Sequence, residues 1–411
     1  MSSFVVSAPG KVILSGEYSA LWGKPAIAAA IGLRSYLLVT PRPRSDRRVT
    51  LRLTDTGFNC TWDLDTLPWG ITKSSDSPAS VIRALQRQLG DPNAAVLAFL
   101  YMYLSLASRT TTGATYTLRS QIPIGAGLGS SASFSVVVAT AILIQAGFII
   151  PRDNELCTEE DLRAIDQASY LGERCFHGAP SGVDHATSLR GGALYFQRDA
   201  LSNFTQPTID RIAEFPELPI LVVDTCQMRS TASAVKSFQQ WIGSHQRGAG
   251  CIIDYIHLTT ELIRKMLVAA PKQQPDPVFI EQMGTLLEIN HQLLQPLGAS
   301  HPRLERVRTV LSHQRLGWTK LTGAGCGGCS LTLLSSQAHG VRLQEGIDQL
   351  ISEGFEVHRT ELGGAGLAIL MPGPDFVPGV DKLWRKFEEI KVNDLHLEME
   401  RLWESKWRCW A

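Results

Sequence analysis

The apolar residues of the chain gather in two uncharged runs that are long enough to form buried helices. Residues 94–107 are apolar on all sides, which is typical of a helix inside a core. A second run, residues 131–150, follows a glycine-rich segment and is interrupted by serine, threonine and glutamine. Because of these polar residues, we predict a core helix there rather than a membrane span.

Shorter segments carry the pattern of strands and of amphipathic helices. Residues 4–6 and 12–14 have strand chemistry, and Pro9 and Gly10 between them predict a turn that carries Lys11. Further strands are predicted at residues 36–40, 49–57, 115–120, 218–223 and 367–371, and further helices at residues 80–89, 159–174 and 230–270. We expect the strand at 218–223 to close a first domain and the helices after it to begin a second.

Apolar residues also recur at roughly helical spacing in the last part of the chain, with charged residues between them. These positions are Leu383, Trp384, Phe387, Ile390, Leu395, Leu402 and Trp403. We expect this tail to be helical and to pack on the body of the protein. The alternative is a face for self-association into a homodimer, for which three tryptophans lie near the end of the chain.

Charge and cysteine content narrow the class of protein. The 411 residues include 39 basic and 39 acidic ones, so nothing favours nucleic acid or an anionic membrane as the main partner. The 8 cysteines are scattered, and the opening MSSFVVSAPG lacks the pattern of a secretory leader, which predicts reduced thiols and a cytoplasmic protein. Cys326 and Cys329 form a CxxC without a second pair, so no zinc site is expected.

The segment between the strand at 115–120 and the helix at 131–150 has the composition of an anion site. Gly125, Gly127 and Gly129 can adopt backbone angles closed to other residues and leave their amides free for a ligand. Ser130 and Ser131 follow where a helix begins, and a helix N-terminus attracts phosphate. We predict a phosphate-binding loop, and the alternative is a glycine turn capped by serine.

A second glycine loop lies further along the chain. Gly323, Gly325 and Gly328 match GxGxxG, but CSLTLL after them has strand rather than helix chemistry, so a dinucleotide-binding fold is not expected. These glycines bring backbone close to a phosphate or to the first loop, and the alternative is a plain hairpin. The chain also lacks GxxxxGK[ST] and the protein-kinase motifs.

Three charged residues complete the parts that phosphoryl transfer requires. Lys11 offers a cation for phosphate oxygens, and Glu173 and Asp184 offer a magnesium ligand and a group for the attacking hydroxyl. The two carboxylates bracket the first part of a segment, residues 175–196, that we predict to be irregular because glycines and a proline recur there. The alternative for each carboxylate is structural, a solvated helix end for Glu173 and a cap for Asp184.

Three segments in this order resemble the motifs of the galactokinase, homoserine kinase, mevalonate kinase and phosphomevalonate kinase superfamily. They are SAPGKVILSGEYSALWGKPAIAAAI, PIGAGLGSSAS and KLTGAGCGGCSLTLL. Within the superfamily, HGAPSGVDHATSLRGGALYF, EINHQLL, GASHPRLE and MRST at 228–231 are similar to segments of mevalonate kinases. The resemblance spans about residues 5–371.

The resemblance implies an α+β fold of two domains and a defined reaction. An N-terminal ATP-binding domain of the ribosomal protein S5 domain 2-like type would cover residues 1–224, and a ferredoxin-like domain residues 225–379. The helical tail, residues 380–411, has no counterpart in the resemblance. The implied activity is ATP- and Mg²⁺-dependent phosphorylation of the C5 hydroxyl of mevalonate in isoprenoid and sterol precursor biosynthesis, with feedback inhibition by isoprenoid diphosphates.

The resemblance also implies roles for single residues. Asp184 matches the base that takes or orients the hydroxyl proton, and Lys11 the residue that steadies it and binds nucleotide. Ser131 and Glu173 match the magnesium ligands. Contacts to the nucleotide are implied for Asp55, Ser120, Gly125, Ala126, Gly127, Leu128, Gly129, Ser130 and Ser131, and contacts to the substrate for Glu17, Tyr18, Ser181 and Thr322.

The chain departs from the pattern of animal mevalonate kinases at three of these places. Tyr18 stands in GEY where GEH is usual, and because GEY occurs in phosphomevalonate kinases, that activity is the alternative. Asp55 stands where asparagine is expected, and Cys326 replaces a glycine, so its backbone needs φ below zero or is strained. A further alternative is a catalytically silent relative that binds a small molecule and signals to a partner.

Overall fold

The fold is known from a computed structural model that describes residues 2–73, 77–90, 92–151, 157–198, 208–212, 215–227, 231–269, 275–372, 380–403 and 405–409. Its strands are β1 (Phe4–Ser15), β2 (Ala26–Pro41), β3 (Arg48–Leu53), β4 (Phe58–Asp63), β5 (Ala114–Ser120), β6 (Ala193–Gln197), β7 (Thr208–Ile212), β8 (Leu218–Asp224), β9 (Gly317–Leu321), β10 (Cys329–Leu334), β11 (Glu356–Leu362), β12 (Ala368–Leu370) and β13 (Arg408–Cys409).

Its α-helices are α1 (Pro78–Gln88), α2 (Ala94–Leu106), α3 (Ser130–Gln145), α4 (Glu159–His177), α5 (Val183–Arg190), α6 (Thr231–Ser244), α7 (Gln246–Ala269), α8 (Pro277–Leu294), α9 (Pro302–His313), α10 (Gly340–Ser352), α11 (Val380–Glu389) and α12 (Leu395–Trp403). Short 3₁₀ helices are η1 (Ser19–Trp22), η2 (Thr54–Thr56), η3 (Ile71–Lys73) and η4 (Val392–Asp394). Helices and sheet strands are mixed along the chain, as expected for an α+β fold.

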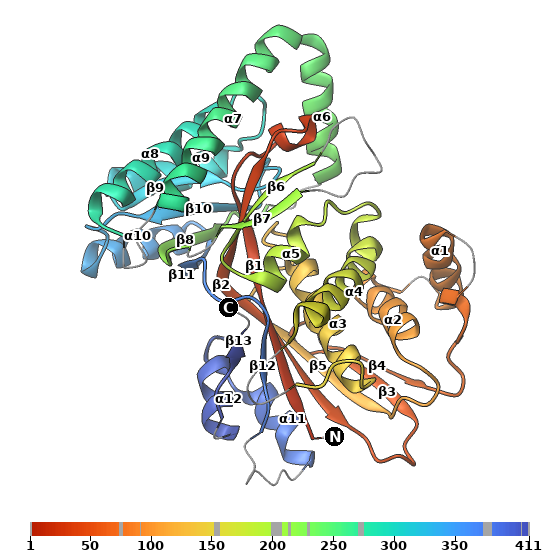
Figure 1. The fold of residues 1–411 in the computed structure, drawn as a ribbon. Helices are drawn as coiled ribbons and strands as arrows, with labels where there is room; N and C mark the ends of the chain where they lie inside the picture. Colours follow the sequence, from red (N-terminus) through yellow and green to blue (C-terminus); the bar gives the residue numbers. More distant parts are fainter. Residues whose placement is uncertain are drawn as a thin grey trace.

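Strand β2 connects the two halves of the molecule. The main path of the sheet runs β13-β12-β1-β2-β11-β8-β10-β9, and β2 also pairs with β5 and β6. Figure 1 shows β1 and β2, in red, crossing the centre of the molecule from the lower half to the upper one. Because β2 has partners from both halves, the two halves share one continuous hydrogen-bonded sheet.

The predicted break at Pro9 and Gly10 is wrong, because β1 continues through both residues. Its pairing with β2 shifts register there, from Pro9 opposite Arg34 to Gly10 opposite Ile31. Such an irregularity lets a strand accommodate proline, which has no N–H to donate. Lys11 therefore lies on a strand and not on a turn.

The lower half holds the two apolar helices that the sequence predicts. Buried side chains of α2 and α3 form one core cluster with residues of β1 to β5 and of α4. Both helices are therefore confirmed as core elements. Of the helices that the structure describes, none combines the length and the apolar character needed to cross a membrane.

The segment predicted to be irregular, residues 175–196, is mostly regular, so that prediction is wrong. Helix α4 extends to His177, and α5 and β6 follow after a short connection. Gly182, with φ of 92°, precedes the first residue of α5, and Gly191, with φ of 68°, follows its last. The glycines thus delimit the helix instead of preventing it, because only glycine adopts such angles readily at both caps.

Strand β8 lies in the sheet of the upper half. It pairs with β10 on one side and with β11 on the other, both antiparallel. That this strand closes the first domain, at a boundary near residue 224, stays a prediction. Helices α6 and α7 follow it as predicted, and β9 and β10 form a hairpin around the second glycine loop.

The tail packs on the body, as predicted. Phe387, Leu395, Met399 and Trp403 are buried in a cluster with apolar residues of β1, β2 and β12. Strand β13 extends the sheet by pairing with β12 (Figure 1). Trp403 is fully buried within the chain, so it cannot serve a self-association face, and a homodimer stays a prediction.

Candidate active site

The first glycine loop is docked against β1 beside Lys11. It connects β5 to α3, the predicted strand, loop and helix. The amide of Lys11 donates to the carbonyl of Leu128 at 2.8 Å. Gly129 has φ of 76°, and a Cβ there would lie 2.9 Å from Cγ of Lys11. Only glycine therefore allows the loop to approach the lysine this closely.

Helix α3 begins at Ser130, directly after Gly129. The first amides of a helix have no partner within it, and they carry the positive end of its dipole. Ser130 and Ser131 are both half-buried at this end. The arrangement fits the predicted phosphate-binding loop, although the nucleotide contacts of its residues stay a prediction.

Lys11 and Asp184 form an ion pair between β1 and α5. Nζ of Lys11 lies 3.1 Å from Oδ2 of Asp184. The lysine side chain is 8% exposed, whereas that of the aspartate is 31% exposed and open to a ligand. Asp184 also lies in the first turn of α5, where the helix dipole favours a carboxylate. The structure thus brings together two residues that the sequence places 173 positions apart.

Glu173 is a buried carboxyl on α4. Its Oε1 has no hydrogen-bond partner among the described residues. Burial and the nearby charge of Asp184 raise the pKa of Glu173 to about 8, while a hydrogen bond from Ser131 and the charge of Lys11 oppose this shift. A charged carboxylate that is buried without a partner costs free energy, and a bound cation offsets that cost. The Glu173 side chain is therefore suited to bind a cation.

His177 is a neighbour of the site that the sequence analysis did not single out. Its Nε2 lies 3.0 Å from Oγ of Ser131, and burial lowers the pKa of the imidazole. His177 and Glu173 are four residues apart on α4, so both face Ser131 from one side of that helix. This i, i+4 spacing is the signal that could have identified His177.

The residues around Ser131 fit a magnesium ion that is shared with phosphates. Within the described part of the chain, no group of three or more His, Cys, Asp or Glu side chains could hold a metal by itself. Mg²⁺ at phosphoryl-transfer sites takes one or two carboxylates and completes its shell with phosphate oxygens and water. The orphaned Oε1 of Glu173 and the hydroxyl of Ser131 meet this requirement.

Asp55 and Ser120 lie together at the end of β5 from which the glycine loop follows. The amide of Ser120 donates to Oδ2 of Asp55 at 2.7 Å, and its hydroxyl lies 3.0 Å from that of Ser35. Arg119 approaches the other carboxylate oxygen, with Nε 3.7 Å from Oδ1. The structure therefore joins the two residues, and their contact with nucleotide stays a prediction.

Glu17 is engaged in a buried network. Its carboxylate pairs with Nζ of Lys320 and accepts from Nδ2 of Asn290 at 2.9 Å. Its side chain is 1% exposed, so its partners are protein groups. The prediction that Glu17 contacts substrate stays untested. The sequence analysis missed Lys320 and Asn290, although Asn290 lies within the quoted EINHQLL.

Tyr18 and Thr322 attach the start of the chain to the second glycine loop. The hydroxyl of Tyr18 donates to the carbonyl of Ala324 at 2.6 Å, and the ring packs against Phe238 with centroids 4.4 Å apart. The hydroxyl of Thr322 accepts from the amide of Ile13 at 2.8 Å. Ser181 lies half-buried between α4 and α5. Their substrate contacts stay predictions.

Cys326 has a left-handed backbone with φ of 56°. Of the two predicted possibilities, φ below zero or a strained backbone, the structure therefore shows the strained backbone. Its amide donates to the carbonyl of Ala299 at 2.7 Å. A Cβ at the preceding Gly325 would lie 2.0 Å from the same carbonyl oxygen. The loop is therefore held tightly against the connection between α8 and α9, and a glycine is required at position 325.

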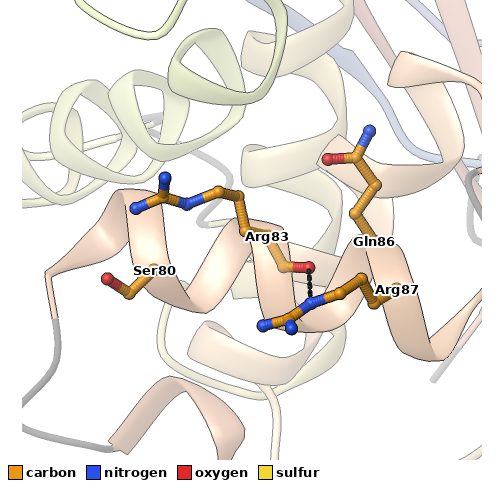
Figure 2. A pocket seen from close by; sticks show the side chains of 4 residues that line it. All are labelled: Ser80, Arg83, Gln86 and Arg87. Carbon is orange, nitrogen blue, oxygen red and sulfur yellow. Dashed lines mark hydrogen bonds between the residues drawn. The ribbon is translucent and has the colours of Figure 1, made fainter.

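A separate pocket of about 580 Å³ lies along α1. Figure 2 shows its lining side chains, Ser80, Arg83, Gln86 and Arg87, with Nε of Arg87 bonded to the carbonyl of Arg83. Helix α1 packs on α2 and η3 rather than on the elements that carry Lys11 and Asp184. None of the predicted site residues lines this pocket.

The fold and the site define a small-molecule kinase of the GHMP class. The model of the GHMP kinases N terminal domain matches residues 78–192, and that of the GHMP kinases C terminal domain matches residues 279–352. The first match contains the glycine loop, Glu173 and Asp184. The α+β fold of two domains is thereby confirmed.

Curated relatives place the chain within this class. It is 38% identical to the mevalonate kinase of Gibberella zeae over 98% of this chain and 82% of that protein, and 34% identical to that of Homo sapiens over 89% and 94%. The protein therefore belongs to the mevalonate kinase family, as the sequence motifs predict. The MRST segment of that resemblance lies outside the described residues at positions 228–230.

Solved structures share the fold. A mevalonate kinase of Methanococcus jannaschii matches with a TM-score of 0.66 at 24% identity, covering 88% of this chain and 98% of that one. A mevalonate kinase of L. major in complex with R-mevalonate matches with a TM-score of 0.65 at 20% identity, covering 88% and 96%. The fold is therefore common to proteins that have diverged widely in sequence.

Proposed function

We propose that the protein transfers the γ-phosphoryl group of ATP to the C5 hydroxyl of mevalonate. The observation that carries this proposal is the Lys11–Asp184 ion pair at 3.1 Å beside the glycine loop that leads into α3. The curated relatives described above are mevalonate kinases, and their names supply the acceptor. Phosphoryl transfer needs positioning and charge stabilisation more than covalent chemistry from the protein, and the pair and the loop offer both.

Asp184 would receive the proton of the acceptor hydroxyl. The hydroxyl oxygen forms a bond to the γ-phosphorus, the bond from that phosphorus to the bridging oxygen breaks, and ADP leaves with the electron pair. Because Asp184 is partly exposed, its carboxylate can reach an acceptor that lies against α5. A general base of this kind typically contributes about 10²–10⁴-fold in rate.

Lys11 would act electrostatically on the Asp184 carboxylate and on the oxygen atoms of the transferring phosphoryl group. Its ammonium group is 3.1 Å from the Asp184 carboxylate and is held beside the glycine loop by the backbone bond to Leu128. A fixed cation there stabilises charge that develops on the transferring group, typically by about 3–4 kcal/mol for one well-placed donor. The lysine thus orients the base and favours the transition state.

Ser131 and Glu173 would hold Mg²⁺ together with the phosphates of ATP. The ion supplies neutralisation of phosphate charge and a fixed geometry for the oxygens around the γ-phosphorus. Oε1 of Glu173 is buried without a hydrogen-bond partner among the described residues, and the hydroxyl of Ser131 bonds both the Glu173 carboxyl and His177. This arrangement supports the assignment of both ligands.

Tyr18 gives no separate support to phosphomevalonate as the acceptor. Its hydroxyl is bonded to Ala324 and its ring is buried against Phe238, so the residue has a packing role. The assembled Lys11–Asp184 pair likewise argues against a silent relative. Feedback inhibition by isoprenoid diphosphates, a homodimer and a cytoplasmic location stay predictions.

A coupled ADP-release assay with mevalonate, phosphomevalonate, homoserine and galactose tests the proposal. We expect turnover with mevalonate, and we expect Asp184→Ala to abolish it while ATP still binds. Asp348→Ala on the exposed surface of α10 is the matched control and should retain full activity. Appreciable turnover by Asp184→Ala would refute the base, and faster turnover of phosphomevalonate would refute the acceptor.

A further inference from the structure

The tail of the chain lies against the edge of the site that carries Asp55 and Ser120. Three side chains on that edge reach it. Nη1 of Arg119 donates to the carbonyl of Phe387 at 2.9 Å and also to that of Ile390. The hydroxyl of Thr54 donates to Glu388 at 3.4 Å, and Nε2 of Gln121 to Asn393 at 3.5 Å.

Arg119 holds the end of α11. The carbonyls of Phe387 and Ile390 lie in the last turn of that helix and just after it, where no further helical N–H is available. A cation at this end also interacts favourably with the helix dipole. Since the Arg119 side chain is only 11% exposed, solvent weakens these bonds little.

The same guanidinium faces the candidate nucleotide edge. Its Nε is 3.7 Å from Oδ1 of Asp55, while Oδ2 of Asp55 accepts the amide of Ser120 at 2.7 Å. Asp55 is therefore held between the backbone of Ser120 and the side chain of Arg119. Arg119 is therefore the side chain through which the tail can act on this carboxylate.

The tail is a fixed support because a core cluster of its own anchors it. Phe387, Leu395, Met399 and Trp403 are each fully buried against Val5, Tyr36, Leu38 and Leu370. These contacts involve β1, β2 and β12 and no residue of the nucleotide edge. The tail that bonds Arg119 is thus itself anchored to the sheet by buried apolar contacts.

We propose that the tail, acting through Arg119, positions the Asp55–Ser120 edge for the nucleoside of ATP. Arg119 is a positioning residue in this role, since it acts on the ligand through Asp55. The inference rests on the proposed function, because it assigns that edge to the nucleotide and not to the acceptor. The tail then determines nucleotide affinity and leaves the phosphoryl-transfer chemistry unchanged.

Two variants approach the contact from its two sides. Arg119→Met keeps the aliphatic stem but removes both bonds to the tail and the contact with Asp55, whereas Phe387→Ala loosens the tail and keeps the Arg119 side chain. We expect each to raise the KM for ATP about five- to tenfold, as expected for an indirect loss of about one charged hydrogen bond. The KM for mevalonate and kcat should stay within about twofold, and Arg119→Lys should restore part of the affinity.

A buried aromatic residue away from this edge provides a control variant that loses stability without disturbing the contact between Arg119 and the tail. Phe355 lies in the core cluster of the upper half, so Phe355→Ala should lower the Tm as Phe387→Ala does and leave the KM for ATP unchanged. The double variant Arg119→Met/Phe387→Ala should be less than additive in its effect on that KM, because both changes act through one contact.

Titration calorimetry with ADP alone measures the same edge without the acceptor. Weaker ADP binding by both variants, with unchanged binding by Phe355→Ala, supports the inference. Equal ADP binding in all variants, or a KM for mevalonate that rises as much as that for ATP, overturns it. A wild-type protein that binds ADP but does not phosphorylate mevalonate would instead refute the proposed function, so the two failures are distinguishable.

Discussion

At the scale of single residues, the site depends on close approach between the glycine loop and Lys11. Gly129 packs on the lysine stem, and the Leu128 carbonyl accepts the lysine amide. The loop therefore serves the phosphates and also positions the cation that pairs with Asp184. A change of one atom at this contact should affect the chemistry more than the fold.

Replacement of Gly129 tests this contact. A Cβ at Gly129 would meet Cγ of Lys11 at 2.9 Å, whereas a Cβ at Gly125 would meet nothing within 4 Å. Both glycines have φ of 76°, so alanine costs a similar backbone strain of about 1–2 kcal/mol at either position. Steady-state kinetics should show Gly129→Ala reducing kcat by roughly a hundredfold, since a displacement of about 1 Å can cost that much.

Gly125→Ala is the matched control and should stay within about fivefold of the wild type, because it carries the strain without the clash. Thermal unfolding of both variants should be similar. Equal kcat losses at the two positions would mean that backbone strain, and not the position of Lys11, limits turnover.

Alanine variants of the two serines at the start of α3 should differ in the magnesium dependence of turnover. Ser131 bonds Glu173 and lies 3.0 Å from His177, so its oxygen belongs to the candidate magnesium position. We expect Ser131→Ala to raise the magnesium concentration for half-maximal turnover by at least about tenfold, and Ser130→Ala to change it less. The reverse order in a magnesium titration would assign the ligand to Ser130.

At the scale of elements, the quoted segments EINHQLL and GASHPRLE join α8, α9 and β9. His291 on α8 accepts the amide of Leu321 at its Nδ1 and lies 2.9 Å from Glu305 at its Nε2. Arg308 bonds Glu305 at 2.8 Å. The similarity of these segments to mevalonate kinases thus reflects a structural support behind the second glycine loop.

This support predicts a fall in stability toward acid. Burial and Arg308 lower the pKa of His291 to about 4, so the stability it contributes is complete above its unfolded value near 6.5 and is lost as the pH falls toward 4. Hydrogen bonds from Ser300, Gln295, Arg308 and His291 outweigh desolvation and lower the pKa of Glu305 to about 2, so its contribution is complete above about 4.5 and is lost toward 2.

Thermal unfolding between pH 7 and pH 2 measures this dependence. Glu305→Gln should lower the Tm at pH 7 and flatten its fall below pH 4.5, because the titrating carboxylate is gone. Glu345→Gln, at an exposed position on α10, is the control and should follow the wild-type curve. A Glu305→Gln curve parallel to the wild type throughout would show that this carboxylate does not set the acid response.

At the scale of the whole molecule, a buried ion pair joins the start of the chain to the upper half. Glu17 follows β1, and Lys320 lies on β9, 303 positions further along the chain. The ammonium of Lys320 also donates to the carbonyls of Ile13 and Leu321, and burial lowers its pKa. The pair therefore connects the segment after Lys11 with the second glycine loop.

Loss of one partner should be more harmful than loss of both. Lys320→Met leaves the Glu17 carboxylate buried without its cation, which typically costs about 3–5 kcal/mol in the free energy of unfolding. The double variant Glu17→Gln/Lys320→Met removes both charges and should recover part of this loss. Denaturant unfolding measures the free energy of unfolding of both variants. If the two are equally stable, the unpaired charge of Glu17 is not the cause of the loss in Lys320→Met.

Sequence patterns were sufficient to predict those helices and strands that the residues of a single segment determine. The apolar runs of α2 and α3 predicted buried helices, because a helix without a polar face has no side to expose. The strand chemistry of CSLTLL predicted β10 after the second glycine loop. The motifs identified the family and brought Lys11, Ser131, Glu173 and Asp184 into consideration before any distance was known.

Only the tertiary structure decided which distant segments meet. The continuity of β1 through Pro9 depends on its pairing with β2, and the place of β8 depends on β10 and β11. The burial of Glu17 against Lys320 and the contact of Arg119 with the tail join residues hundreds of positions apart. Local patterns record the periodicity and the backbone angles of a segment, whereas these partners are chosen by the topology of the sheet, which no single segment contains.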